Sequence, residues 1–241
     1  MSLEQDPPIT AEDIGDSLLV KRQYQEAIEQ YRKMPNPSAD LWNKMGIAYQ
    51  MLFDPKDAAR CYRETLRRNP AHAYALNNMG TIYDTQGDFA KAEGYYRKAL
   101  DANPGSARSA MNLGTNLMAQ RRYSEGSEMY KRALTLDPDV LDTSEGPVST
   151  SGVPLEQRGA MNYYKAKDYA QAGMIDRAMR FLRKALNEGF ASPNEIARDS
   201  SFSSLRETPA FKRLMAEHAK DPGSPQSPSN DSADESSAAD E

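Results

Sequence analysis

The chain has 241 residues, 39% of them hydrophobic, so it can build one large domain or two small ones around an apolar core. Its net charge of -5 is concentrated in residues 221–241, which hold six of the 35 acidic residues and no lysine or arginine. The other 29 acidic residues nearly balance the 30 basic ones, which gives no electrostatic reason to expect nucleic acid or an anionic membrane as a partner.

The first predicted element is a shortened helical hairpin in residues 1–38. Gly15, Ala27 and Tyr31 each precede an identical residue of the next repeat by 31 positions. Because the repeats that follow are 34 residues long, the second helix of this hairpin is predicted to end three residues early, near Pro35.

Residues 39–138 contain three consecutive copies of a 34-residue repeat without insertion or deletion. In the second copy, Leu76 and Tyr83 fall on one helical face, and Ala92 and Tyr96 fall on another. Each copy is therefore predicted to form two helices. The aligned positions are Trp42, Leu76 and Ala110; Met45, Met79 and Leu113; Gly46, Gly80 and Gly114; Tyr49, Tyr83 and Leu117; Ala58, Ala92 and Gly126; Tyr62, Tyr96 and Tyr130; Leu66, Leu100 and Leu134; and Pro70, Pro104 and Pro138.

Glycine and proline positions indicate how each hairpin turns and packs. Gly87 suits a left-handed helix end, Asp88 is a predicted N-cap of the second helix, and Pro104 ends the unit. Inside a helix, Gly80 costs about 1 kcal/mol relative to alanine, so it must serve packing. We expect Gly80 to face Ala92 closely, with tyrosines filling the flanking space.

Residues 139–158 are predicted to be an inserted surface loop, because they are rich in turn formers and poor in large apolar residues. Two interpretations stay open, a binding element and a tolerated insertion. Residues 159–190 are predicted to form a fourth, degenerate hairpin, offset from the third copy by 52 residues. The residues that match at this offset are Ala166, Tyr169, Ala178, Leu182, Ala185 and Leu186.

The last two predicted elements are a C-terminal helical cap in residues 191–220 and a disordered acidic tail in residues 221–241. Phe202, Leu205, Phe211 and Leu214 are spaced for short helices, one of them starting at Pro209. The tail is rich in proline, serine, glycine and acidic residues and has no aromatic residue, a composition typical of disorder.

The repeat resembles the tetratricopeptide repeat family, whose 34-residue unit carries a large apolar residue, a Leu-Gly pair, Tyr, Ala, an aromatic residue, Ala and Pro at these offsets. The resemblance implies an all-α fold, a right-handed superhelical solenoid of antiparallel helix-turn-helix hairpins with a C-terminal cap. It also implies binding as the class of function. Bacterial members of the family often end in a pattern similar to Asp199, Phe202, Leu205, Arg206, Pro209 and Phe211.

No residue pattern points to catalysis or to a metal site. His72 and His218 lie 146 residues apart, and neither has a second ligand at metal-binding spacing, so His72 is interpreted as a solvated or capping residue. Cys61 is the only cysteine, which excludes an intrachain disulfide and favours a packing role. We therefore expect no catalytic residue, no cofactor and no enzymatic activity.

Near the N-terminus, the longest apolar run is Leu18–Val20, far shorter than a signal-peptide core or a membrane span. We expect a soluble, cytoplasmic protein. A periplasmic or secreted location stays open, because Met1–Leu3 could stand in place of a native leader.

In such a solenoid, the first helix of each hairpin lines a concave groove. Asn78 and Asn112 could bond an extended peptide backbone, or asparagine could recur there for helix-local reasons. The groove candidates by spacing are Asp40, Asn43, Lys44, Ile47, Tyr74, Asn77, Asn78, Thr81, Arg108, Met111, Asn112 and Thr115.

The chaperone-binding branch of the family grips a terminal carboxylate with a set of lysine, arginine and asparagine side chains. Only Asn78 and Arg108 match that set here, while Asn43, Ile47 and Asn112 stand where Lys, Asn and Arg are needed. One guanidinium is a weak carboxylate clamp, so this interpretation is disfavoured.

The leading hypothesis is a non-enzymatic scaffold that holds a peptide or helix of an unidentified protein partner in the groove. Two alternatives remain. The chain could assemble with itself through the incomplete first repeat, or serve as an accessory subunit of an enzyme or secretion assembly, with its acidic tail as a tether or decoy.

Overall fold

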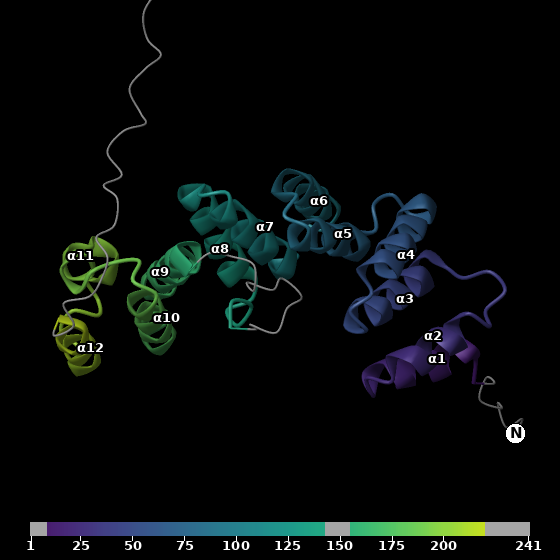
Figure 1. Ribbon diagram of the computed structural model, residues 1–241, viewed down its shortest axis with the longest axis horizontal. Coiled ribbons are helices and arrows are strands. Elements are labelled where there is room, and N and C mark those ends of the chain that lie inside the picture. Colours follow the sequence, from purple (N-terminus) through teal and green to yellow (C-terminus); the bar gives the residue numbers. More distant parts are fainter. Residues whose placement is uncertain (1–8, 143–154, 220–241) are drawn as a thin grey trace, which may run out of the picture. The chain divides into compact units, whose positions relative to one another are not determined.

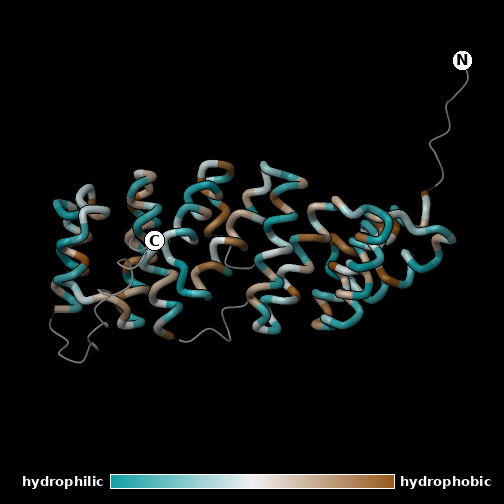
Figure 2. The backbone as a smooth tube through the Cα atoms, turned by 90° about the horizontal axis from the view of Figure 1, so that it is seen from above, coloured by the Kyte–Doolittle hydropathy of each residue, from teal (hydrophilic) through white to brown (hydrophobic). Residues whose placement is uncertain are grey.

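The computed structural model describes residues 9–142 and 155–219 of the chain. These residues form α-helices and one short 3-10 helix, and no β-strand occurs among them. They fall into two compact units, Met1–Gly152 and Val153–Glu241. Along the helices, hydrophobic positions recur between hydrophilic ones, as Figure 2 shows. The all-α fold predicted from the sequence is confirmed.

The first unit is a series of helical hairpins, which follow one another from purple to teal in Figure 1. The second helix of the first hairpin, α2, has 8 residues, whereas the second helices of the later hairpins have 14. It is thus six residues shorter and ends at Tyr31, whereas the sequence predicted a loss of three residues near Pro35. The pairs are α1 (Ala11–Val20) with α2 (Tyr24–Tyr31), α3 (Ala39–Met51) with α4 (Pro55–Arg68), α5 (Ala73–Thr85) with α6 (Phe89–Ala102), and α7 (Ala107–Ala119) with α8 (Tyr123–Leu136).

Local sequence signals begin these helices and turn the chain between them. The Asp88 carboxylate accepts a hydrogen bond from the Lys91 amide at the start of α6, and Gly87 is left-handed at a φ of 76°, both as predicted. Ser38, Asp54, His72 and Ser106 cap α3, α4, α5 and α7 in the same way. The other turns of this unit place Arg22, Phe53 and Arg121 in the left-handed region.

In each hairpin of the first unit, a glycine of the first helix lies under a tyrosine of the second. A Cβ atom added at Gly80 would lie 2.5 Å from Cε1 of Tyr96, a fully buried ring. The ring therefore covers the glycine directly, whereas the sequence prediction placed it in the flanking space. The other pairs of this kind are Gly15 with Tyr31, Gly46 with Tyr62, and Gly114 with Tyr130.

The second unit begins with the hairpin of α9 (Leu155–Gln171) and α10 (Ile175–Asn187), in which Tyr169 stacks on Phe181 with ring centroids 5.5 Å apart. α11 (Pro193–Arg198), the 3-10 helix η2 (Ser200–Phe202) and α12 (Pro209–Ala219) follow. Helix α12 starts at Pro209, as predicted. The four apolar residues expected to hold this segment are all buried, namely Phe202, Leu205, Phe211 and Leu214.

The expected loop 139–158 differs from the structure at both of its described edges. Val140 and Leu141 are buried, because this apolar pair lies shortly after the end of α8 at Leu136 and packs instead of facing water. Helix α9 already begins at Leu155, since residues 155–158 are all good helix formers. Residues 143–154 of this loop and the predicted disordered tail, residues 221–241, lie outside the described residues.

Candidate peptide-binding face on helices α3, α5 and α7

The twelve predicted groove residues lie on α3, α5 and α7 and differ widely in exposure. Asp40, Tyr74 and Arg108 are exposed, one on each helix. Lys44, Ile47, Asn78 and Thr115 are half-buried. The five that are buried, and so closed to a ligand, are Asn43, Asn77, Thr81, Met111 and Asn112.

Four of the predicted residues, Asn43, Asn77, Asn78 and Asn112, form what we call the asparagine row. Asn112 Nδ2 donates to Asn77 Oδ1 at 2.9 Å, and Asn78 Nδ2 donates to Asn43 Oδ1 at 3.4 Å. Asn77 Nδ2 also donates to Asn78 Oδ1 at 3.5 Å. These bonds join α3 to α5 and α5 to α7. The amides thus connect neighbouring repeats, a role that neither sequence interpretation included.

Both threonines of the predicted set donate a hydroxyl hydrogen bond within their own helix, and Thr115 Oγ1 also lies 3.1 Å from Tyr130 Oη on α8. Thr81 Oγ1 donates to the Asn77 carbonyl at 3.2 Å, and Thr115 Oγ1 donates to the Met111 carbonyl at 3.0 Å. Such bonds to the carbonyl four residues earlier are common for threonine in helices. These hydroxyls support the helix backbone beneath the exposed side chains.

Asp40 and His72 link two successive hairpins at the edge of this face. His72 Nδ1 accepts a hydrogen bond from the Ala75 amide at 3.1 Å, and its Nε2 lies 2.8 Å from Asp40 Oδ1. A neutral His72 therefore carries its proton on Nε2 and donates it to Asp40. His72 is a buried capping residue, as one of its two sequence interpretations held. The side chain of Asp40 stays 78% exposed.

Lys44 is held by α1 of the preceding hairpin. Its Nζ lies 2.7 Å from Asp16 Oδ2 and 3.0 Å from Glu12 Oε1. Burial by itself would lower the pKa of Lys44, but the hydrogen bonds to Asp16 and Glu12 outweigh it and raise the pKa. The ammonium is therefore committed to the fold and is poorly placed to receive a ligand carboxylate.

Asp84 of α5 is a half-buried carboxylate that sequence reasoning missed. It accepts hydrogen bonds from Tyr96 Oη at 2.7 Å and from Asn116 Nδ2 at 2.6 Å. Burial raises the pKa of Asp84, although both hydrogen bonds oppose the shift. The sequence contained a sign of this polar contact. At the 34-residue spacing, the polar Asn116 occupies the position at which the two earlier repeats have the apolar Ala48 and Ile82.

The chemistry elsewhere in the described chain is sparse. Burial raises the pKa of the Cys61 thiol to about 11, so this cysteine stays protonated near neutral pH. Within residues 9–142 and 155–219, no three His, Cys, Asp or Glu side chains gather as a metal site would require. No helix in these ranges combines the length and apolarity needed to cross a bilayer.

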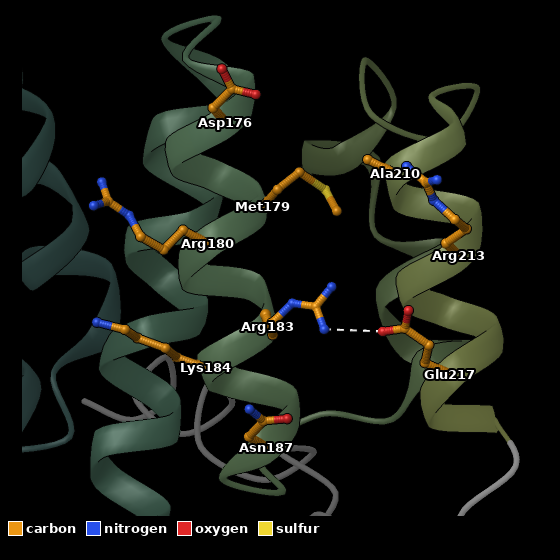
Figure 3. A pocket seen from close by; sticks show the side chains of 9 residues that line it. All are labelled: Asp176, Met179, Arg180, Arg183, Lys184, Asn187, Ala210, Arg213 and Glu217. Atoms are coloured by element: carbon orange, nitrogen blue, oxygen red, sulfur yellow. Dashed lines mark hydrogen bonds and ion pairs between the residues drawn. The ribbon is translucent and has the colours of Figure 1, made fainter.

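Two hollows lie away from the twelve predicted residues. One of about 170 Å³ adjoins Trp42, Tyr49 and Cys61. A larger one of about 680 Å³ lies between α10 and α12, and its side chains are drawn in Figure 3. Sequence reasoning missed the larger hollow, although basic residues recur at helical spacing along α10. These are Arg177, Arg180, Arg183 and Lys184.

Two models of the tetratricopeptide repeat family match this chain, one over residues 43–107 and the other over residues 85–144. Residues 43–144 therefore contain tetratricopeptide repeats. The matched segments hold α5, α7 and most of α3, so Tyr74 and Arg108 lie within them, whereas Asp40 lies three residues before the first match.

Solved structures of other helical repeat proteins share the fold. PilF of Pseudomonas aeruginosa is 17% identical, with a TM-score of 0.55 over 86% of this chain and 86% of its own. A double mutant of MamA RS-1 is 17% identical, with a TM-score of 0.51 over 74% of this chain and 92% of its own. No curated protein sequence matches the chain. At these identities, the likeness extends to the fold alone.

Proposed function

We propose that the chain is a non-enzymatic scaffold that binds a segment of a partner protein across α3, α5 and α7. The observation that carries this proposal is the series of exposed residues at one repeat position. Asp40, Tyr74 and Arg108 are 34 residues apart, so each occupies the same place in its hairpin. Stacked hairpins present such positions as an extended surface, which suits an elongated ligand.

The chemistry of these three residues supports a protein ligand. Tyr74 is 66% exposed, and tyrosine and arginine are the residue types that most often dominate the energy of protein interfaces. Asp40 and Arg108 carry opposite charges on the two outer helices of the face. A bound segment would therefore be oriented with its basic side chain near Asp40 and its acidic side chain near Arg108.

The asparagine row supports the proposal in a different way. Its hydrogen bonds hold the three helices in register beneath the exposed side chains, and a surface held in place before binding loses less entropy when a ligand arrives. Because Asn112 is buried in this row, replacing it would disturb packing as well as binding. The exposed residues are the better choice for a binding test.

The test is a peptide selection on the intact chain, followed by affinity measurement. Peptides are selected from a random displayed library, and their Kd values are measured by fluorescence anisotropy. The variant Tyr74→Ala with Arg108→Ala is expected to bind at least about tenfold more weakly than the unchanged chain, because each removed side chain is of the type that contributes 1 kcal/mol or more to an interface.

A matched control removes one aromatic residue and one cation that lie outside α3, α5 and α7. Phe53, in the turn between α3 and α4, is 93% exposed, and Arg63 is exposed on α4. The variant Phe53→Ala with Arg63→Ala should keep the Kd of the unchanged chain. Equal weakening by both double variants, or a library that yields no binder, would contradict the proposal.

A further inference from the structure

The smaller hollow, of about 170 Å³, lies beside α3 and α4. Trp42, Met45 and Tyr49 of α3 and Cys61 of α4 give it largely apolar walls, and Arg32, the residue after α2, also lines it. A space of this size holds a single aromatic ring, because an apolar cavity of about 150 Å³ in another protein binds benzene.

The next repeat shows what occupies the equivalent place there. At the 34-residue spacing, Tyr83 corresponds to Tyr49, and Tyr95 corresponds to Cys61. The Tyr95 ring stacks on Tyr83, with centroids 5.4 Å apart and planes 15° from parallel. Cys61 has no ring to offer, and within residues 9–142 and 155–219 no aromatic ring stacks on Tyr49. The hollow therefore marks the place of a ring that the second hairpin lacks.

Polar groups at the hollow also lack partners. Arg32 Nη2 donates to Tyr49 Oη, but Arg32 forms no ion pair with any described residue. Trp42 Nε1 is buried, and the described part of the chain gives it no acceptor, which is a further sign of incomplete packing. Arg60, by contrast, is paired with Asp57 at 3.3 Å. A ring with a carboxylate close to it would therefore suit this site, with Arg32 as the cation.

The same chain carries an exposed ring in the turn between α3 and α4. Phe53 is 93% exposed, and its backbone is left-handed at a φ of 58°. A bulky side chain is strained in that conformation, and the equivalent residue of the next hairpin is Gly87. Met51 and Leu52, directly before Phe53, are exposed as well. Packing within one copy does not account for an apolar ring at this position.

We propose that Phe53 of one copy enters the hollow of a second copy and stacks on Tyr49 there. The phenyl ring has the size of the ring that the second hairpin lacks. Asp54, the next residue, accepts a hydrogen bond from the Asp57 amide but forms no ion pair among the described residues. Its carboxylate would come close to Arg32 of the second copy, so size and charge both match.

This contact joins two unlike surfaces, because each copy has one exposed ring and one hollow. Such contacts link copies into rings or open chains, or into a dimer when two copies exchange their rings. None of Asp40, Tyr74 and Arg108 takes part. Self-association and peptide binding on α3, α5 and α7 are therefore separate, and each can fail without the other.

The first experiment is sedimentation velocity of the intact chain between about 10 and 500 μM, over which its average mass should rise. Phe53→Ala removes the ring, and Cys61→Tyr fills the hollow as Tyr95 does in the next repeat. Each change alone should raise the Kd of self-association at least about tenfold. An equimolar mixture of the two variants should form a complex of two chains, because it contains one ring and one open hollow. A mixture that stays monomeric, or an unchanged chain that is monomeric throughout, would overturn the proposal.

Matched controls separate this contact from general surface adhesion. Cys61→Ser leaves the hollow open, and Tyr74→Ala removes an exposed ring from another helix, so both should associate as the unchanged chain does. Arg32→Glu tests the contact at an exposed position and should weaken association about two- to fivefold, whereas Lys33→Glu beside it should not. Weakening by a control, or none by Arg32→Glu, would overturn the proposed geometry.

The second experiment uses Trp42, the only tryptophan of the chain, as a reporter inside the hollow. The acceptor is the Phe53→Ala variant. The donor carries Trp42→Phe and Cys61→Tyr, so it keeps its exposed ring and has no tryptophan emission. Adding the donor should shift the acceptor's emission to shorter wavelength until the shift saturates. A donor that also carries Phe53→Ala should cause no shift. Association without a shift would place the contact elsewhere and overturn the proposal.

Discussion

At the scale of single residues, Gly80 shows how one absent side chain shapes a repeat. Its position in α5 is filled by the Tyr96 ring, whose hydroxyl reaches Asp84 of the same hairpin. The contact therefore combines a buried aromatic ring with a hydrogen bond, and both depend on the close approach of α5 and α6. This close packing compensates for the low helix propensity of glycine.

The change Gly80→Ala is expected to lower the free energy of unfolding by about 1–3 kcal/mol, because its new methyl group would overlap the buried Tyr96 ring. Urea unfolding followed by circular dichroism measures this loss. Gly94→Ala on α6 is the matched control, because outside the adjoining backbone of its own helix nothing lies within 4 Å of an added Cβ there. It should stabilise the chain by up to about 1 kcal/mol. A Gly80→Ala variant as stable as the unchanged chain would refute the packing role.

At the scale of helices, polar contacts between successive hairpins supplement the apolar core. The asparagine row joins the first helices of three hairpins, and Glu93 of α6 joins the next hairpin through Arg122 Nη1 at 2.6 Å and Gln120 Nε2 at 3.1 Å. These contacts connect residues 27 to 35 positions apart. Each one therefore depends on the register in which two hairpins stack.

The asparagine row is expected to contribute unequally along its length. Asn112→Ala removes the donor of the 2.9 Å bond and leaves the buried Asn77 oxygen without it, which should cost about 1–3 kcal/mol. Asn78→Ala removes longer bonds at a half-buried position and should cost less than about 1 kcal/mol. Urea unfolding of the two variants tests the difference. Equal losses would show that the row does not act through the buried bond.

At the scale of the whole molecule, both compact units contain carboxylates held in the ionised form. Burial by itself would raise the pKa of Glu93, but Arg97, Gln120 and Arg122 lower it below its usual value. In the second unit, burial is likewise outweighed by hydrogen bonds from Tyr163, Ser201 and Lys167, which lower the pKa of Asp199 to about 2. Acidification should therefore weaken both units.

The sign follows from the direction of these shifts. A carboxylate whose pKa is lower in the folded chain adds stability above its unfolded pKa of about 3.9 to 4.3, and this contribution is lost as the pH falls toward the folded value. Between pH 7 and pH 3, amide hydrogen exchange should therefore show falling opening free energies in α6 and in α9. The variant Asp199→Asn should reduce the pH-dependent fall of the opening free energy in α9. It should leave the fall of the opening free energy in α6 unchanged. A decline unaffected by this variant would exclude Asp199 as its source.

The hairpins could be predicted because their signals are local. Gly87, Asp88 and Pro209 each act within a few residues of chain, through backbone conformation, an amide hydrogen bond or a fixed φ angle. The exposure of the twelve groove candidates was harder to predict. Helical periodicity identifies the face of α7 that turns away from its own hairpin partner, but it cannot tell whether the previous repeat covers Asn112 on that face.

The 34-residue period, the helical hairpins and the concentration of negative charge in residues 221–241 follow from the amino-acid sequence alone, because each is a pattern of neighbouring residues. The tertiary structure decided which asparagines are buried, that a tyrosine ring covers Gly80, and that a hollow lies between α10 and α12. These features join side chains from separate helices. Their distances are set by how the helices stack, and the sequence pattern of one helix does not contain that information.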